Sequence, residues 1–174
     1  MIIGRAIGRL LDGETFISNT PDCSEIAIKY NYGNQDALDK FIAQSNKVQA
    51  TKYPLVFYVI NSVKDLDGWK YCNTDLIIMM NTKEELLYKN RTDKTYIPYI
   101  EPLYNKLKTL LIKEPYFQIL ESSKLDRLSY SDVPNFGIVK GSVGNNKSKE
   151  SVVTDYVDAR VIKINFRIKT NCIK

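Results

Sequence analysis

The sequence contains no histidine. This absence excludes Ser–His and Cys–His catalytic pairs, histidine metal ligands and acid–base chemistry by an imidazole. An enzyme built from this chain would have to work with carboxylates, lysine or tyrosine alone. Such an enzyme is possible, but the absence of histidine counts against it.

Cysteine is scarce, and long apolar runs are missing. The three cysteines, Cys23, Cys72 and Cys172, match neither a zinc site nor a disulfide framework, and they favour a reducing compartment. No stretch approaches the roughly 18 consecutive apolar residues of a membrane span. The amino terminus has arginines inside its apolar run, which is a poor match to a secretory signal. We expect no membrane contact.

The composition is that of a globular protein. Of the 174 residues, 44% are apolar and 26% are charged, so a single domain over 1–174 can bury its own core. Residues 1–24 are interpreted as an amino-terminal extension, and residues 139–151 as a flexible loop because of their Gly, Ser and Asn content.

The net charge of +5 is unevenly distributed. From Lys140 onward there are eight basic and three acidic residues, whereas the preceding chain carries 17 of each. A basic carboxyl-terminal part could contact nucleic acid or an acidic protein surface. The alternative is a solvated strand face without a partner.

Two apolar runs predict the centre of the fold. Residues Leu55–Ile60 and Leu76–Met80 are apolar at every position, which is typical of strands covered on both faces. A polar connection through Asp67 and Gly68 joins them, and it predicts an antiparallel pair with a rather long loop. This hairpin is expected to be the centre of an α+β fold.

The other elements follow from apolar spacing, which is three to four residues in helices and two in strands. In chain order, we expect a helix over 1–11, a loop over 15–23, a strand over 25–32, a short helix carrying Ala37, Leu38, Phe41 and Ile42, a helical turn after Thr82, a long helix over 96–113, and strands over 115–120 and 162–169.

The last strand alternates cleanly, with Lys163, Arg167 and Lys169 on its outward side. The preceding Val157, Ala159 and Val161 have the opposite phase. A β-bulge near Val161 would reconcile the two halves.

Candidate catalytic patterns are weak. The loop Gly141–Ser148 resembles a phosphate-binding loop, but two asparagines separate Gly144 from Lys147, so a loop between strands is the better interpretation. Acid–base catalysis needs carboxylates that converge in a cleft, and nothing else converges on the available aspartates. Turn and strand positions explain the two candidate pairs, which are Asp65 with Asp67 and Asp155 with Asp158.

Tyrosine is abundant, with twelve residues. Tyrosine offers a large contact area and a polar tip, which suits protein interfaces. Tyr96 and Tyr99 lie at the start of the long predicted helix and are candidates for contacts with other subunits. Partial burial in the core is the alternative.

Four segments in fixed order carry a family resemblance. They are Tyr53-Pro-Leu-Val-Phe-Tyr-Val-Ile, the second apolar strand within Trp69–Met80, the helix opening Tyr96-Ile-Pro-Tyr-Ile-Glu-Pro-Leu-Tyr, and the closing strand Asp155–Phe166. From about Ile26 to Ile173 the chain resembles the tail-terminator-like neck and connector proteins of tailed bacteriophages. It is most similar to ring proteins of crAss-like phages.

The resemblance implies a mainly antiparallel, curved sheet with helices packed on one face. It implies copies assembled into a ring of six or twelve between portal or adaptor and tail, with DNA in the lumen. The resemblance further implies a protein that is assembled in the host cytoplasm, resides in the virion neck or tail, is not an enzyme, and binds no cofactor or metal. The side chains that we select for subunit or DNA contact are Lys163, Arg167, Lys169, Tyr96, Tyr99, Lys147 and Lys149.

Two other functions stay open. One is a small basic DNA-binding module that uses Lys163, Arg167 and Lys169, for which the affinity should depend steeply on salt. The other is an enzyme of unknown class, against which the lack of converging polar groups argues.

Overall fold

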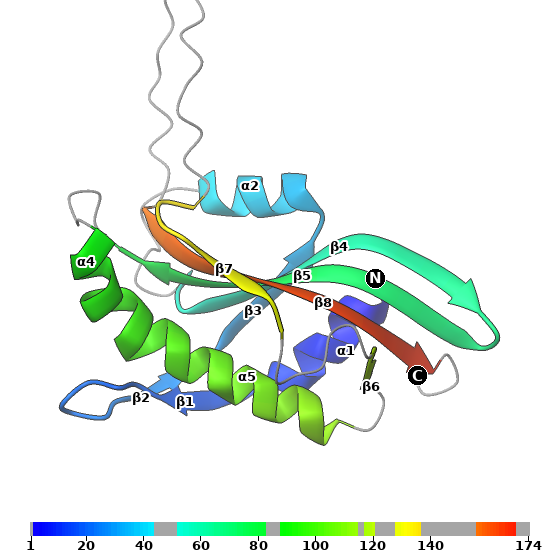
Figure 1. Ribbon diagram of the computed structural model, residues 1–174, viewed down its shortest axis with the longest axis horizontal. Helices are drawn as coiled ribbons and strands as arrows, with labels where there is room; N and C mark the ends of the chain where they lie inside the picture. The colour runs from blue at the N-terminus through cyan, green and yellow to red at the C-terminus, as the bar shows by residue number, and fades with distance from the viewer. Residues whose placement is uncertain are drawn as a thin grey trace, which may run out of the picture.

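A long antiparallel hairpin forms the centre of the fold (Figure 1). The computed structural model describes residues 2–43, 52–82, 88–114, 117–120, 128–136 and 156–169. The hairpin consists of β4 (Leu55–Leu66) and β5 (Trp69–Asn81). Asp67 and Gly68 connect them with φ angles of 49° and 74°, as tight hairpin turns require. The predicted hairpin is confirmed. The predicted long connection is wrong, because its polar residues continue both strands up to this turn.

Four more strands extend the hairpin into an open, mixed sheet. Its order is β3-β4-β5-β8-β6, with β7 also paired to β8. The added strands are β3 (Lys29–Gly33), β6 (Phe117–Ile119), β7 (Tyr130–Val133) and β8 (Val157–Lys169). Only the β3–β4 pair is parallel among the described strands.

The predicted strand over 25–32 is divided between two sheets. Its first part is β2 (Glu25–Ala27), which pairs with β1 (Thr15–Ile17) in a separate two-stranded sheet, so the predicted loop over 15–23 contains a strand. At Ile28 the chain changes its pairing partner: the Ile28 N–H donates to the Glu14 carbonyl, whereas the next N–H donates to the Pro54 carbonyl. The remainder joins the main sheet as β3.

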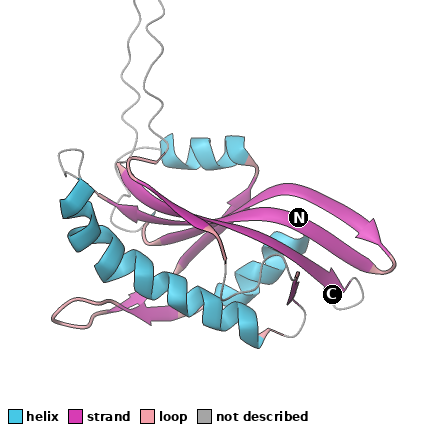
Figure 2. Ribbon diagram, in the orientation of Figure 1, coloured by secondary structure: helices cyan, strands magenta, loops and turns pink. Residues whose placement is uncertain are grey.

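Helices cover both faces of the main sheet (Figures 1 and 2). On one face, α1 (Ile2–Leu11) and α5 (Glu101–Lys113) bury a core that includes Val56, Tyr58, Leu76 and Ile78. On the other face, α2 (Gln35–Ala43) packs on Leu55, Phe57, Ile77 and Met79. The prediction of two covered faces for the central hairpin is confirmed. The implied arrangement with helices on one face only is wrong, because α2 packs opposite the other helices.

Local signals fix the ends of the first two helices. Beyond Leu11, Gly13 has a φ of +72°, which suits a glycine just after a helix. At α2, the Asn34 side chain accepts a hydrogen bond of 2.9 Å from the Ala37 N–H, so it caps the helix start. Both helices confirm the predictions.

The long predicted helix is regular only from Glu101. It is preceded by α4 (Tyr88–Arg91) and by a π-helix, η1 (Thr92–Ile100), with Pro98 inside it. Pro102 lies in the first turn of α5, a position at which proline is tolerated. In η1 the i→i+5 bonding changes which side chains share a face. Ile97 is therefore 47% exposed instead of joining the predicted apolar stripe.

The predicted β-bulge near Val161 is wrong. β8 pairs with β5 in unbroken register from Val157 opposite Asn81 to Lys169 opposite Trp69. Val157 and Ala159 point to the α2 side, while Ile162 and the alternate residues after it point to the α1 and α5 side. The apolar side chains change from one face of β8 to the other because α2 covers one face at the start of the strand, and α1 and α5 cover the other face further along. The bulge in this part of the sheet lies in β4, between Ile60 and Ser62.

Some predictions concern residues outside the described ranges. These are the loop over 139–151 with Lys147 and Lys149, Cys172, Asp155, and most of the helical turn after Thr82. Among the described helices, none has both the length and the apolar character that a membrane crossing needs.

Candidate nucleic-acid interface on the sheet

One part of the main sheet has no helix over it among the described residues. α2 covers its face only near β3, the end of β5 and the start of β8. Towards the hairpin turn, the same face carries exposed and half-buried side chains. We call this surface the distal sheet face. Its residues are Ser62, Lys64, Leu66, Trp69, Tyr71, Asn73, Asp75, Lys163, Asn165, Arg167 and Lys169.

The strand register places these side chains together. Residues directly opposite each other in an antiparallel pair point to the same face. Tyr71 lies opposite Lys64 in β4 and Arg167 in β8, and Trp69 lies opposite Lys169. Because side chains alternate along a strand, these rows continue the face on which Ile77 packs under α2. The face is therefore the uncovered extension of a buried sheet surface.

The distal sheet face is strongly positive. Lys64, Lys163 and Lys169 are exposed and Arg167 is half-buried. The only carboxylate in these rows is Asp75, opposite Lys163, and it accepts a 3.1 Å hydrogen bond from the Asn61 amide. Four cations against one carboxylate leave a clear excess of positive charge.

Arg167 is held in a defined position. Its guanidinium carbon lies 4.4 Å from the centre of the Trp69 ring, a cation–π contact. Nε donates to the Gln118 side chain at 2.9 Å, and Nη1 reaches the Tyr71 hydroxyl at 3.5 Å. Both partners are cross-strand neighbours of Arg167, on β6 and β5. The guanidinium is thus positioned by three strands before any ligand arrives.

The structure brings together three of the predicted contact residues and separates the others. Lys163, Arg167 and Lys169 share the distal sheet face. Tyr96 is 5% exposed and its hydroxyl lies 3.4 Å from the Ala159 carbonyl, so it packs in the core. Tyr99 is half-buried on η1, on the opposite side of the sheet.

Three contributors were missed from the sequence, namely Lys64, Trp69 and Tyr71. Lys64 lies in the polar residues before the predicted connection, and Trp69 and Tyr71 lie between that connection and the second apolar run, where no contact residue was selected. The alternation of Trp69, Tyr71 and Asn73 was the available signal, and it becomes informative once both strands extend to the Asp67-Gly68 turn.

No protein-family model matches this sequence, and no curated protein is significantly similar to it. We therefore infer the function from the surfaces and buried sites of the chain itself.

A second polar site is buried around Arg160, which is 4% exposed. Its Nε and Nη2 donate to the two carboxylate oxygens of Asp132 at 2.7 and 3.0 Å, and Nη1 donates to Glu101. Its guanidinium also lies against the rings of Tyr104 and Tyr130, at 5.1 and 4.0 Å. Burial alone would lower the pKa of Arg160, but the hydrogen bonds to the two carboxylates outweigh it and raise that pKa. The network joins β8, β7 and α5.

A cavity of about 300 Å³ borders this network, with Thr92, Tyr96 and Ile97 on its other side. Its charged groups already bind one another, so it presents an internal ion cluster and no reactive group. Nearby, Arg91 and Asp158 form a second buried ion pair at 2.5 Å. The Arg160 network connects α5 and β7 to β8, and the Arg91–Asp158 pair connects α4 to β8, so both have a structural role.

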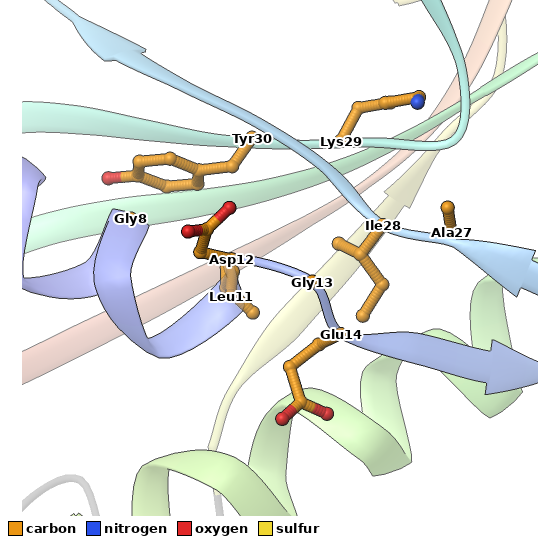
Figure 3. A pocket seen from close by; sticks show the side chains of 9 residues that line it. All are labelled: Gly8, Leu11, Asp12, Gly13, Glu14, Ala27, Ile28, Lys29 and Tyr30. Carbon is orange, nitrogen blue, oxygen red and sulfur yellow. The ribbon is translucent and has the colours of Figure 1, made fainter.

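A second cavity lies between α1 and β3 (Figure 3). It has a volume of about 440 Å³, and its charged side chains, Asp12, Glu14 and Lys29, point in different directions. Glu14 forms a 2.7 Å ion pair with Lys106. The Tyr30 hydroxyl donates to the Gly4 carbonyl at 2.7 Å, and burial raises the pKa of Tyr30 above its ordinary value. These groups do not form a nucleophile–base pair.

The aspartates of the hairpin turn have structural roles too. Asp65 pairs with Lys70 at 2.7 Å, and Asp67 adopts the positive φ of the turn. Among the residues that the structure describes, no three Cys, Asp or Glu side chains gather in a way that could hold a metal ion.

Proposed function

We propose that this chain is a structural protein of the head–tail connector of a tailed phage. Copies form a ring of six or twelve around the DNA channel of the virion and dock a portal or adaptor to the tail. The sheet would then have the curved form of the tail-terminator-like fold. The distal sheet face carries the proposal, because it is a broad, rigid and exposed surface suited to a macromolecule.

The location of the resembling segments supports this proposal. They coincide with β4, β5, η1 with the start of α5, and β8. These elements contribute both to the hydrophobic core and to the distal sheet face. The buried ion clusters around Arg160 and Arg91 are engaged internally, and surface contact is the activity that the geometry supports best.

An open strand edge supplies a route to assembly. β3 pairs with residues Leu55 to Val59 of β4, so the rest of β4 has no strand partner on its outer side among the described residues. Val63 and Leu66 in this part are 40% and 57% exposed. An open edge can pair with another chain, and a head-to-tail contact that closes by rotation produces a ring. A stable contact of this kind buries more than about 1,000 Å².

Particle images of the purified chain test the proposal. We expect rings in negative-stain electron microscopy. Val63→Asp should reduce their number several-fold, since a carboxylate would be buried at the contact. Ile112→Asp is the matched control, because Ile112 is 60% exposed on α5, away from the strand edge. Particles without rings at every concentration, or equal effects of the two substitutions, would contradict this assembly.

A monomeric DNA-binding module is the second candidate, and the positive charge of the distal sheet face favours it. A chain that stays monomeric but binds DNA through Lys163, Arg167 and Lys169 would support this candidate over the ring.

A further inference from the structure

We propose that the distal sheet face binds the sugar–phosphate backbone of double-stranded DNA and does not read its bases. The inference depends on the proposed function only in placing DNA beside the chain. The binding itself needs a single copy, so it can be tested separately from ring formation.

Charge complementarity identifies the partner as a polyanion. Lys64, Lys163, Arg167 and Lys169 share one surface, and its single carboxylate, Asp75, already accepts a hydrogen bond. The chain as a whole has a net charge of +5, so this surface is not offset by a large acidic excess elsewhere. Nucleic acid gains affinity at such a surface through the release of its counterions.

The spacing of the cations suits an extended row of charges. Arg167 and Lys169 are two residues apart on a strand, which is roughly 7 Å. Lys163 lies on the same side of β8, six residues before Lys169, at roughly 20 Å. Lys64 lies two strands away from Arg167, at roughly 10 Å. A ligand that contacts all four must be a polymer with repeated negative charges.

Arg167 is prepared for a phosphate. Its contacts with Gln118 and Tyr71 use two of its five N–H donors, and within the described part of the chain the others have no partner. Arginine binds phosphate oxygens through paired N–H donors. Because Trp69 and Gln118 already hold the side chain, less conformational entropy is lost on binding.

The aromatic contacts favour duplex DNA over a single strand. Proteins that bind single strands offer open aromatic faces on which bases stack. Here the Arg167 guanidinium lies over the Trp69 ring and also reaches the Tyr71 hydroxyl. Full discrimination between base pairs needs an element that enters the major groove, such as a helix or a two-stranded ribbon. The distal sheet face is wider than a ribbon, because its rows run across β4, β5 and β8. Contact with the sugar–phosphate backbone of the duplex is therefore the binding mode that fits this face.

Fluorescence anisotropy of the full chain with a labelled 20-base-pair duplex tests this inference. Between 50 and 200 mM salt, we expect the logarithm of the binding constant to fall with a slope of about −3.6, from four phosphates at roughly −0.9 each. Duplexes of unrelated sequence should bind equally. Replacing Arg167 and Lys169 together by Gln should weaken binding and make the slope shallower by about 1.8.

A control variant distinguishes the effect of removing charge from the distal sheet face from the effect of lowering the net charge of the chain. Lys94 and Lys113 are exposed on η1 and α5, so Lys94→Gln with Lys113→Gln removes the same charge elsewhere. The control should leave the slope within about 0.3 of that of the unmodified chain. Equal weakening by both double variants, or no binding to duplex at 50 mM salt, would overturn the inference.

Two competing ligands complete the test. A single-stranded oligonucleotide that binds more tightly than the duplex, or polyglutamate that binds this face when the duplex does not, would also overturn the inference. Light scattering on the same samples reports assembly independently. Rings without DNA binding would refute this inference alone, and DNA binding by a permanent monomer would refute the ring alone.

Discussion

Arg160 shows how a single residue connects distant parts of this chain. It lies on β8, binds Asp132 beside β8 and Glu101 at the start of α5, and is almost fully buried. An isolated buried charge is unfavourable, so the burial of this guanidinium is tolerated because both carboxylates surround it. The sequence gives no sign of this network, since the three residues are far apart along the chain.

Replacing Arg160 by Leu should destabilise the fold by about 2–3 kcal/mol, because two carboxylates would lose their partner. This is less than the roughly 3–5 kcal/mol typical of a fully buried pair, because Asp132 and Glu101 are 25% and 45% exposed and water can solvate them in part. Urea unfolding followed by circular dichroism measures the change. Adding Asp132→Asn should recover part of the loss. A loss below about 0.5 kcal/mol would show that the network contributes little.

Cys72 should respond to alkaline pH. Burial raises the pKa of its thiol to about 11, so the folded chain favours the neutral thiol. The unfolded thiol has a pKa of about 8.5. The stabilisation is therefore fully present below about pH 8.5 and is lost as the pH rises towards 11.

Urea unfolding at pH 8 and pH 10 checks this prediction. The difference in unfolding free energy between the unmodified chain and Cys72→Ala should shrink at the higher pH. Iodoacetamide at pH 8 should modify the exposed Cys23 in the folded chain and Cys72 only after unfolding. Equal rates of modification for the two thiols would contradict the burial of Cys72.

At the scale of elements, β8 shows what a sequence pattern can and cannot predict. Its alternation gave the correct side for Lys163, Arg167 and Lys169. The change of phase at Val161 was explained by a bulge, whereas α2 covers the opposite face at that end. Spacing along a strand does not reveal which distant helix covers each face. Spacing along a strand also does not reveal which strand pairs with it, so the parallel pairing of β3 with β4 was not predicted.

The packing of α1 on β3 depends on glycine. A Cβ atom at Gly4 would meet the Tyr32 ring, and one at Gly8 would lie 3.0 Å from the Tyr30 ring. Gly4→Val should therefore destabilise the fold by about 1–3 kcal/mol through overpacking. Arg5→Val on the same helix is the control, since Arg5 is exposed. Urea unfolding should show a clearly larger loss for Gly4→Val, and equal losses would exclude close packing as the cause.

The whole molecule has a covered end and a partly bare end. Near β3 and α2 the sheet is buried on both faces, and towards the hairpin turn one face is exposed and positive. The predicted two-sided core and hairpin are confirmed, because continuous apolar runs report burial directly. Only part of the distal sheet face was predicted, namely the outward side chains of β8. Lys64, Trp69 and Tyr71 of the same face belong to polar segments that fold as strands because β4 pairs with β5 and β5 pairs with β8.

The mass of the purified chain in solution, measured by light scattering over a wide concentration range, tests the central claim most directly. A ring subunit should form a species of six or twelve times the chain mass of 20.0 kDa. A constant mass of 20.0 kDa at every concentration would contradict the proposal that this protein acts by assembling with copies of itself.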